Sequence, residues 1–187
     1  MFIFFDLKSC IIIHFMKTKA LFLDRDGIIN IDKSYVYKIE DFEFCEGIFT
    51  LCAFFQKKGF KIIVITNQSG IARGFYSEKD FENLSAFMCE SFLQKGIKID
   101  KIYHCPHLEG CECRKPRPGM LLSAAKDFNI NLKESFFVGD NLTDMEAGLN
   151  AGIENLFLIK KDFKAEDKFK VFANLKELLE YLKKEEK

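Results

Sequence analysis

The chain has 187 residues, of which 48% are hydrophobic, so it is long enough to bury a substantial core in one domain. Lys plus Arg equals Asp plus Glu at 28 each, which argues against a basic surface for nucleic acid or an anionic membrane. Seven cysteines, three of them between Cys105 and Cys113, fit a reduced cytoplasmic protein with a metal site better than a disulfide framework.

The first fifteen residues are apolar but are interrupted by Asp6, Lys8 and His14. They lack the basic start and the small-residue cleavage site of a signal peptide, and they are too short to span a bilayer. Met16-Lys-Thr-Lys-Ala would be a natural start directly before the first predicted strand. We therefore expect residues 1–15 to be an upstream extension and residues 16–187 to form a single domain without membrane contact.

An apolar run that begins at Leu21 ends in two carboxylates, Asp24 and Asp26, followed by Gly27. The pattern indicates a buried parallel strand whose carboxyl end opens into a ligand-binding crevice. Alternation along an extended strand would point Asp24 and Asp26 the same way and Arg25 elsewhere. Two neighbouring anions favour a hard divalent cation such as magnesium between them. Taken alone, the motif could also be an Asx turn that closes the strand.

Residues 31–44 are polar and irregular, and we interpret them either as a flap beside the crevice or as an ordinary surface loop. A helix is predicted over residues 47–58, because its periodicity stops at Gly59. Residues 61–65 repeat the design of the first strand and lead into Thr66, whose hydroxyl and the amides after it could present donors to a phosphate. A polar turn after a core strand would show the same pattern.

A long helix capped by Ser77 and a strand over residues 99–104 come next. Arg114 and Lys115 then occupy a proline-stiffened loop, and Pro118 suits the first turn of the following helix. Basic side chains in such a loop are suited to clamp an anion, and a solvated basic loop is the alternative.

Another strand of the opening design, residues 135–138, ends at Asp140 before a helix that Gly152 closes. Acidic residues at the start of a helix could also serve only as caps, because they complement the helix dipole. A short last strand over residues 156–159 and a C-terminal helix around residues 175–182 are assigned to packing.

Strands that alternate with helices predict an α/β fold with a central parallel sheet. The carboxyl ends of its strands meet at one edge, so Asp24, Asp26, Thr66 and Asp140 should lie together with Lys115. This set offers carboxylates for a cation, a hydroxyl and an ammonium for anionic oxygens, and a carboxylate that can act as a nucleophile. It therefore fits phosphoryl transfer, in which positioning and charge neutralisation supply most of the catalysis.

Four motifs resemble those of the haloacid dehalogenase superfamily of phosphatases: Asp24-x-Asp26-Gly27, Thr66-Asn67-Gln68, Lys115 and Gly139-Asp140-x-x-x-Asp144. Together with the cysteine loop, they are similar more narrowly to the D,D-heptose 1,7-bisphosphate phosphatases and the related histidinol-phosphatases. The resemblance covers residues 19–159 and implies a three-layer α/β/α Rossmann-like fold with no large cap domain and a small zinc-binding loop. Asn141 and Ser34 depart from the family, which commonly has lysine and glycine at these positions.

The resemblance implies that Asp24 attacks phosphorus to form an aspartyl-phosphate. Asp26 would protonate the leaving oxygen and later deprotonate the attacking water. Thr66 and Lys115 would hold the phosphoryl oxygens. The magnesium ligands that it implies are Asp24, Asp26 through its backbone carbonyl, and Asp140, with Asp144 in a supporting position.

The substrate that the resemblance implies is a small phosphorylated sugar, D-glycero-D-manno-heptose 1,7-bisphosphate, cleaved at C7 on the route to the ADP-heptose of the lipopolysaccharide core. Histidinol phosphate or another small phospho-sugar is the alternative, because the related phosphatases share the motifs. We expect the enzyme to act as a monomer. The implied substrate contacts are Asp32, Lys33, Ser34, Tyr35, Thr66, Asn67, Gln68, Ser69, Arg114, Lys115 and Asn141.

The pattern Cys-x-His-x-x-x-Cys-x-Cys, formed by Cys105, His107, Cys111 and Cys113, predicts one structural zinc ion with a closed tetrahedral ligand set. His104 is a possible substitute ligand. Such an ion would order the basic loop that follows. A nucleic-acid-binding zinc module is the competing class of protein, and the balanced charge argues against it. Two alternatives remain: a reduced cysteine cluster that binds no metal, and a metal-stabilised scaffold protein that is not an enzyme.

Overall fold

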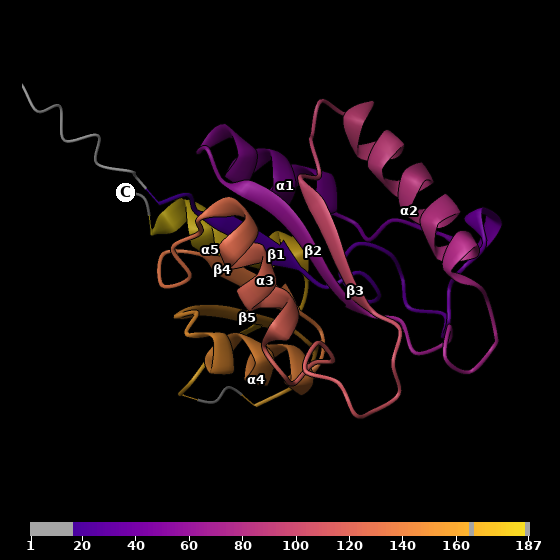
Figure 1. The fold of residues 1–187 in the computed structure, drawn as a ribbon. Coiled ribbons are helices and arrows are strands. Elements are labelled where there is room, and N and C mark those ends of the chain that lie inside the picture. The colour runs from indigo at the N-terminus through magenta and orange to yellow at the C-terminus, as the bar shows by residue number, and fades with distance from the viewer. Residues whose placement is uncertain (1–16, 165–166, 186–187) are drawn as a thin grey trace, which may run out of the picture.

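The computed structural model describes residues 17–164 and 167–185, which form three layers with a parallel sheet between two groups of helices (Figure 1). The predicted three-layer α/β fold is confirmed. The expected upstream extension lies outside the described residues. The strands are β1 Ala20–Leu23, β2 Lys61–Asn67, β3 Lys101–Cys105, β4 Phe136–Gly139, β5 Asn155–Ile159 and β6 Lys170–Phe172. The helices are η1 Ile39–Asp41, α1 Ile48–Lys57, α2 Glu78–Leu93, α3 Gly119–Phe128, α4 Leu142–Ala151 and α5 Leu175–Lys184.

The strand order is β3-β2-β1-β4-β5-β6, and every pairing is parallel. The chain winds outward from β1 in one direction through β2 and β3, and in the other through β4, β5 and β6. Leu23, the last residue of β1, pairs with Val64 of β2 and Val138 of β4. The loops after these three strands therefore meet at the point where the strand order reverses, which is where open α/β sheets bind ligands.

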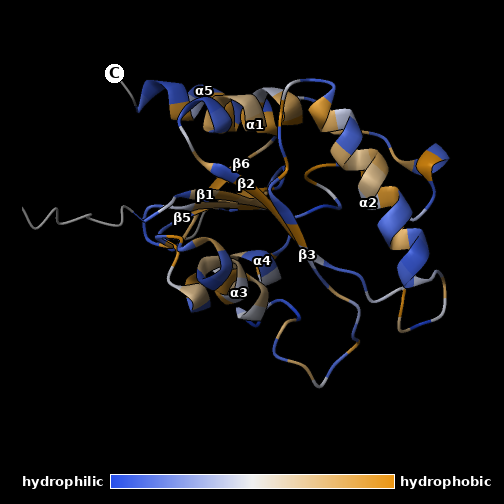
Figure 2. Ribbon diagram, turned by 45° about the horizontal axis from the view of Figure 1, so that its top comes forward, coloured by the Kyte–Doolittle hydropathy of each residue, from blue (hydrophilic) through white to orange (hydrophobic). Residues whose placement is uncertain are grey.

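Alternating residues of the central strands bury both faces of the sheet, and a helical layer covers each face (Figure 2). Helices α1, α2 and α5 pack on the face that includes Leu21, Leu23, Ile62 and Val64. Helices α3 and α4 pack on the opposite face, which presents Phe22, Ile63, Ile65 and Phe137. The sheet is thus held rigidly at its centre, so the loops at its carboxyl edge start from fixed positions.

The five predicted strands and five predicted helices are present, with boundaries within two residues of those expected. Strand β6 was not predicted, because three residues at the edge of a charged stretch carry too little pattern to indicate a strand. Within the described residues, the segment between β1 and β2 holds only loops, η1 and α1, and no cap domain. None of the described helices has the length and apolar character needed to cross a membrane.

Candidate active site

A cavity of about 300 Å³ lies at the carboxyl ends of the central strands. Asp24 and Asp26 contribute to its wall from the loop after β1. Nine of the predicted substrate contacts also line it: Asp32, Ser34, Tyr35, Thr66, Asn67, Gln68, Ser69, Lys115 and Asn141. The structure therefore gathers residues that are more than 100 positions apart in the sequence into one polar site.

Three carboxylates meet at one end of this site, and one buried ammonium lies against them. Asp24, Asp140 and Asp144 each offer an oxygen, and these oxygens lie within 4.8 Å of one another. The Nζ atom of Lys115 lies 2.8 Å from Asp24 Oδ1 and 2.6 Å from Asp144 Oδ1. It also donates a hydrogen bond of 2.9 Å to the backbone carbonyl of Ile65. One ammonium leaves the cluster with an excess of negative charge, which suits a divalent cation with oxygen ligands.

The pKa values of these groups reflect the same shortage of positive charge. Burial, and next the charge of Asp144, raise the pKa of the Asp24 carboxyl well above its ordinary value. The same two causes raise the pKa of Asp140 to about 6. Burial alone would lower the pKa of Lys115, but the carboxylates of Asp144 and Asp24 raise it. The carboxylates would therefore gain from a bound cation, so the donor set fits magnesium.

Two glycines let the carboxylates come this close. Gly27 has a φ of 85°, and a Cβ atom built on it would lie 2.3 Å from Asp140 Oδ2. A Cβ atom on Gly139 would lie 2.4 Å from the Cβ atom of Asp144. Any larger residue at either position would displace an acidic side chain, which explains physically why each motif pairs glycine with aspartate.

The loop that carries Lys115 is fixed by the amide side chain of Asn67, at the end of β2. Asn67 Nδ2 donates to the backbone carbonyl of Lys115 at 3.2 Å, and the backbone N–H of Lys115 donates to Asn67 Oδ1 at 3.1 Å. Only 4% of the surface of Lys115 is exposed. Asn67 was predicted to contact substrate, and this pair of bonds gives it a structural task as well, because it locks the ammonium against the carboxylates.

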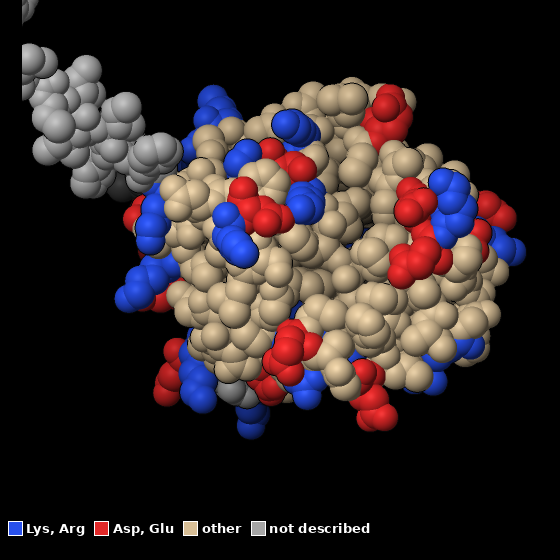
Figure 3. Space-filling view, in the orientation of Figure 1, with Lys and Arg blue, Asp and Glu red and all other residues tan. Residues whose placement is uncertain are grey.

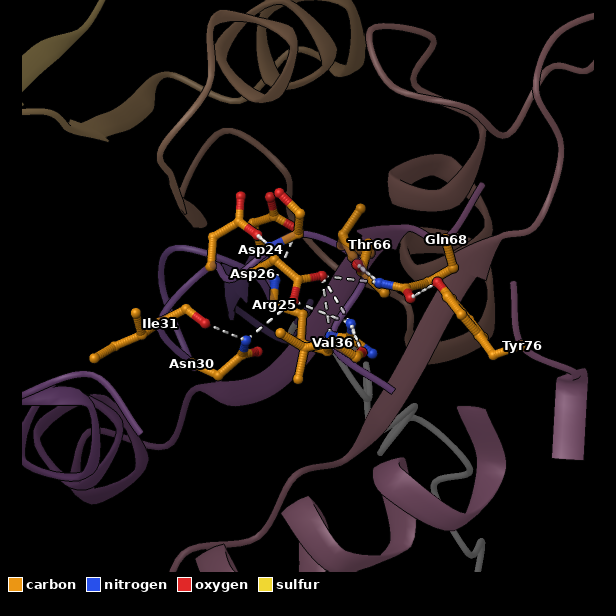
Figure 4. A network of polar contacts seen from close by, with 12 residues as sticks. Asp24, Arg25, Asp26, Asn30, Ile31, Val36, Thr66, Gln68 and Tyr76 are labelled. Atoms are coloured by element: carbon orange, nitrogen blue, oxygen red, sulfur yellow. Dashed lines mark hydrogen bonds and ion pairs between the residues drawn. The ribbon is translucent and has the colours of Figure 1, made fainter. Parts of the chain in front are cut away.

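The carboxylate of Asp26 does not belong to this group of three and is surrounded by donors (Figure 4). Arg25 Nε donates to Asp26 Oδ2 at 3.1 Å, and Asn30 Nδ2 and Gln68 Nε2 each donate to the carboxylate at 3.0 Å. The expectation that Arg25 points away from Asp26 is wrong, because β1 ends at Leu23 and the alternation of an extended strand ends with it.

Two predicted substrate contacts do not line the cavity. The Nζ atom of Lys33 lies 3.3 Å from Glu43 Oε2 at the surface. Arg114 Nη1 donates to the backbone carbonyl of His107 at 3.2 Å, which joins the basic loop to the cysteine loop. Lys33 is thus engaged in a surface ion pair and Arg114 in a loop contact, and neither side chain lines the cavity.

The cavity is also lined by two residues that were not among the predicted site residues, Tyr76 and Thr143. Thr143 lies inside the Gly-Asp-x-x-x-Asp motif, so its position in that motif was an available signal. Tyr76 precedes α2, and its hydroxyl donates to Gln68 Oε1 at 2.6 Å. Nothing in its sequence neighbourhood indicates this contact, because it depends on how the loop after β2 folds back.

The predicted zinc ligands Cys105, His107, Cys111 and Cys113 converge at the end of β3. Their sulfur atoms lie 3.1 to 3.5 Å apart, and His107 Nδ1 lies 3.5 and 3.6 Å from two of them. Zinc–sulfur bonds of about 2.3 Å place tetrahedral thiolates roughly 3.8 Å apart, so the four groups fit one zinc ion with a small expansion. His104 lies outside this group, with its Nε2 atom 2.9 Å from Glu78 Oε2.

Comparisons with known proteins agree with this geometry. A family model described as polynucleotide kinase 3 phosphatase matches residues 1–183. A D-glycero-alpha-D-manno-heptose-1,7-bisphosphate 7-phosphatase of Campylobacter jejuni is 60% identical over 171 residues, which are 91% of this chain and 99% of the relative. The chain belongs to the D,D-heptose 1,7-bisphosphate phosphatase family of the haloacid dehalogenase superfamily. The assignment made from the sequence motifs is confirmed.

Two other members of the heptose bisphosphate phosphatase family extend the comparison. A D-glycero-beta-D-manno-heptose-1,7-bisphosphate 7-phosphatase of Helicobacter pylori is 50% identical over 169 residues, 88% of this chain and 97% of the relative. The crystal structure of a D,D-heptose 1,7-bisphosphate phosphatase from B. bronchiseptica, complexed with magnesium and phosphate, superposes with a TM-score of 0.81. Its sequence is 29% identical, and the match covers 90% of this chain and 99% of that one.

Proposed function

We propose that this protein removes the C7 phosphate from D-glycero-D-manno-heptose 1,7-bisphosphate, on the route to the ADP-heptose of the lipopolysaccharide core. The observation that carries the proposal is a site with Asp24 and Lys115 in contact, in a chain 60% identical to a phosphatase of that name. The cavity is open and about 300 Å³, which suits a small phospho-sugar.

In the first step, Asp24 attacks phosphorus and the bond between phosphorus and the sugar oxygen breaks. Asp24 Oδ1 accepts from the backbone N–H of Arg25 at 2.7 Å and faces Lys115, whereas Oδ2 has no donor among the described residues. Oδ2 therefore keeps a lone pair for the attack. Asp26 gives its proton to the departing oxygen, which leaves as an alcohol.

In the second step, water attacks the phosphorus of the aspartyl-phosphate and Asp26 accepts the proton of that water. The bond between phosphorus and Asp24 breaks, which releases inorganic phosphate and restores the free carboxylate. Lys115 and the hydroxyl of Thr66 hold the phosphoryl oxygens through both steps. Splitting the hydrolysis in this way replaces one difficult displacement with two easier ones.

We propose magnesium as the cofactor, held by Asp24, Asp140 and the backbone carbonyl of Asp26, with Asp144 in support. The excess of buried carboxylate over ammonium supports this choice. When bound, magnesium would offset the negative charge that gathers on the transferring phosphoryl group.

Magnesium is expected to stabilise the protein, and to do so less in acid. The raised pKa of Asp140, about 6, means that the carboxylate is ionised at pH 7.5 and costs stability there until a cation offsets it. Below that pKa, protons compete with the metal. At 100 times its Kd, magnesium should add about 2.7 kcal/mol, or roughly 5 to 10 °C in Tm, at pH 7.5. Thermal unfolding with and without magnesium at pH 7.5 and pH 5 checks this, and equal shifts at both pH values would contradict it.

We propose that Cys105, His107, Cys111 and Cys113 bind one structural zinc ion without taking part in the chemistry. The loop they form adjoins Arg114 and Lys115, so an ordered loop would fix the basic residues. Four protein ligands leave no open position at which water could be activated.

Protein purified without added zinc should contain about one equivalent per chain. The double variant Cys111→Ser with Cys113→Ser should lose the ion and raise KM about tenfold, because the loop that positions Arg114 and Lys115 is then no longer ordered. Cys89→Ser, in α2 and outside the cluster, is the matched control. Metal analysis and steady-state kinetics test both parts. Zinc-free native protein would overturn the site, and full activity without zinc would overturn its contribution.

Substrate choice is tested by phosphate release from both anomers of D-glycero-D-manno-heptose 1,7-bisphosphate and from histidinol phosphate. We expect the larger kcat/KM for a heptose bisphosphate. A larger value for histidinol phosphate would assign the enzyme to the rival reaction with the same chemistry.

Positive and negative side chains are interspersed over the face in Figure 3, which offers no basic track for a nucleic acid.

We further propose that the enzyme works in the cytoplasm as a monomer. Cys105, Cys111 and Cys113 are free although their sulfur atoms lie close together, which fits a compartment that keeps thiols reduced. The groups assigned to the reaction form a complete site within one chain, so the proposed chemistry needs no residue from a second copy.

A further inference from the structure

Gln68 joins the carboxylate of Asp26 to the hydroxyl of Thr66. Its Nε2 atom donates to Asp26 Oδ2 at 3.0 Å and to Thr66 Oγ1 at 2.8 Å (Figure 4). Only 2% of Gln68 is exposed, so water does not replace either bond. Because Thr66 accepts from Gln68, its own hydroxyl proton is free to face a phosphoryl oxygen.

The amide of Gln68 could make these bonds only in one of its two orientations. In the other orientation, Oε1 would lie against the carboxylate of Asp26, and Thr66 would have to give its proton to Gln68. The carboxylate of Asp26 only accepts, so it requires the first orientation, and the hydroxyl of Tyr76 donates to Oε1 at 2.6 Å and anchors the amide there. Burial raises the pKa of Tyr76 to about 12, so the phenol keeps its proton across the range in which enzymes work.

The ring of Tyr76 is held where this bond requires it. It packs onto the loop after β2 at Gly70, where an added Cβ atom would lie 2.1 Å from Tyr76 Cε1. Tyr37 stacks on the ring at 5.3 Å, with the planes 11° apart. Only 6% of Tyr76 is exposed. A glycine that makes room, a stacking partner and a buried hydroxyl with one acceptor together indicate a built contact.

The other donors to Asp26 cannot take over this task. Arg25 has no acceptor and stays bound to both oxygens of the carboxylate. Asn30 Nδ2 is shared between Asp26 and the backbone carbonyl of Ile31, which anchors its amide in place. Among the described donors to Asp26, Gln68 is therefore the one whose amide oxygen a second side chain, Tyr76, holds in place.

We propose that Tyr76 is a positioning residue of the reaction, which fixes the amide of Gln68 so that Asp26 is held in place to accept the proton of the attacking water. The proposal rests on the function proposed above for Asp26. Its test uses p-nitrophenyl phosphate with magnesium, so it does not depend on which sugar is the substrate.

Nitrophenolate leaves without a proton, so its release in a single turnover, with enzyme in excess, reports the attack by Asp24. Steady-state release also requires Asp26 to activate water. In Tyr76→Phe we expect the single-turnover rate constant to stay within about twofold of wild type and steady-state kcat to fall about 10- to 100-fold. The phosphoenzyme should accumulate. Equal losses in both measurements, or none in either, would overturn the proposal.

Three further variants separate positioning from a general structural effect. Gly70→Ala, which displaces the ring but removes no polar atom, should show the same split as Tyr76→Phe. Tyr37→Phe keeps the stacking ring and should match wild type. In a Gln68→Leu background, Tyr76→Phe should cause no further loss, because the two residues act through one amide. Additive losses would overturn the proposal. A wild-type protein that forms no phosphoenzyme would instead refute the proposed mechanism itself.

Discussion

Replacing Asp24 with asparagine is expected to lower phosphate release by a factor on the order of 10⁴ or more while the protein stays folded. An amide oxygen is a poor nucleophile toward phosphorus and a weak ligand for magnesium, so both tasks of Asp24 fail together. The backbone N–H of Arg25 can still bond the side-chain oxygen, and Lys115 keeps Asp144 as its partner. The loss should therefore appear in kcat, measured with phosphate release under saturating substrate and magnesium.

Stability provides the control for this variant. The raised pKa of Asp24 means that its ionised form is disfavoured in the folded protein, so at neutral pH a neutral amide removes a cost. The Tm of metal-free Asp24→Asn should equal or exceed that of the metal-free parent. A folded Asp24→Asn protein with near-normal turnover would rule out the aspartyl-phosphate mechanism. Asp26→Asn should be similarly inactive.

The sequence contained enough information to place the acidic and hydroxyl groups at one edge of a parallel sheet. The apolar runs before Asp24, Thr66 and Asp140 have the length of buried strands, and helices separate them. Parallel strands must then present their ends together. The grouping of the four residues proposed to bind zinc could also be predicted, because Cys105 and Cys113 lie close enough in the chain for a local loop to join them.

The orientation of Arg25 could not be obtained in this way. Its backbone carbonyl accepts from the N–H groups of Ile28, Ile29 and Asn30, so the chain turns directly after β1. Strand alternation applies only while the chain is extended, and a turn of this kind depends on close contacts such as that between Gly27 and Asp140. Tyr76 and β6 were missed for a related reason, because long-range packing and not local pattern determines both.

Replacing Lys115 with methionine is expected to cause the largest loss of stability in the site. The ammonium bonds Asp24 and Asp144, and only 4% of the residue is exposed. Removing one partner of a buried ion pair leaves the remaining charges uncompensated, which commonly costs about 3 to 5 kcal/mol, or roughly 6 to 20 °C in Tm. Lys33→Met is the matched control, since Lys33 pairs with Glu43 at the surface and should change stability by less than about 1 kcal/mol.

A second substitution shows whether charge is the cause. Lys115→Met with Asp144→Asn removes one anion along with the cation, so much of the lost Tm should return, and added magnesium should restore part of it in Lys115→Met alone. Activity should return in neither case, because the phosphoryl oxygens still lack the ammonium. Thermal unfolding of the parent, Lys115→Met, Asp144→Asn and the double variant, with and without magnesium, measures this coupling. If Lys115→Met unfolds at the temperature of the parent, the buried ammonium does not hold the carboxylates together, because their repulsion would otherwise have appeared as lost stability.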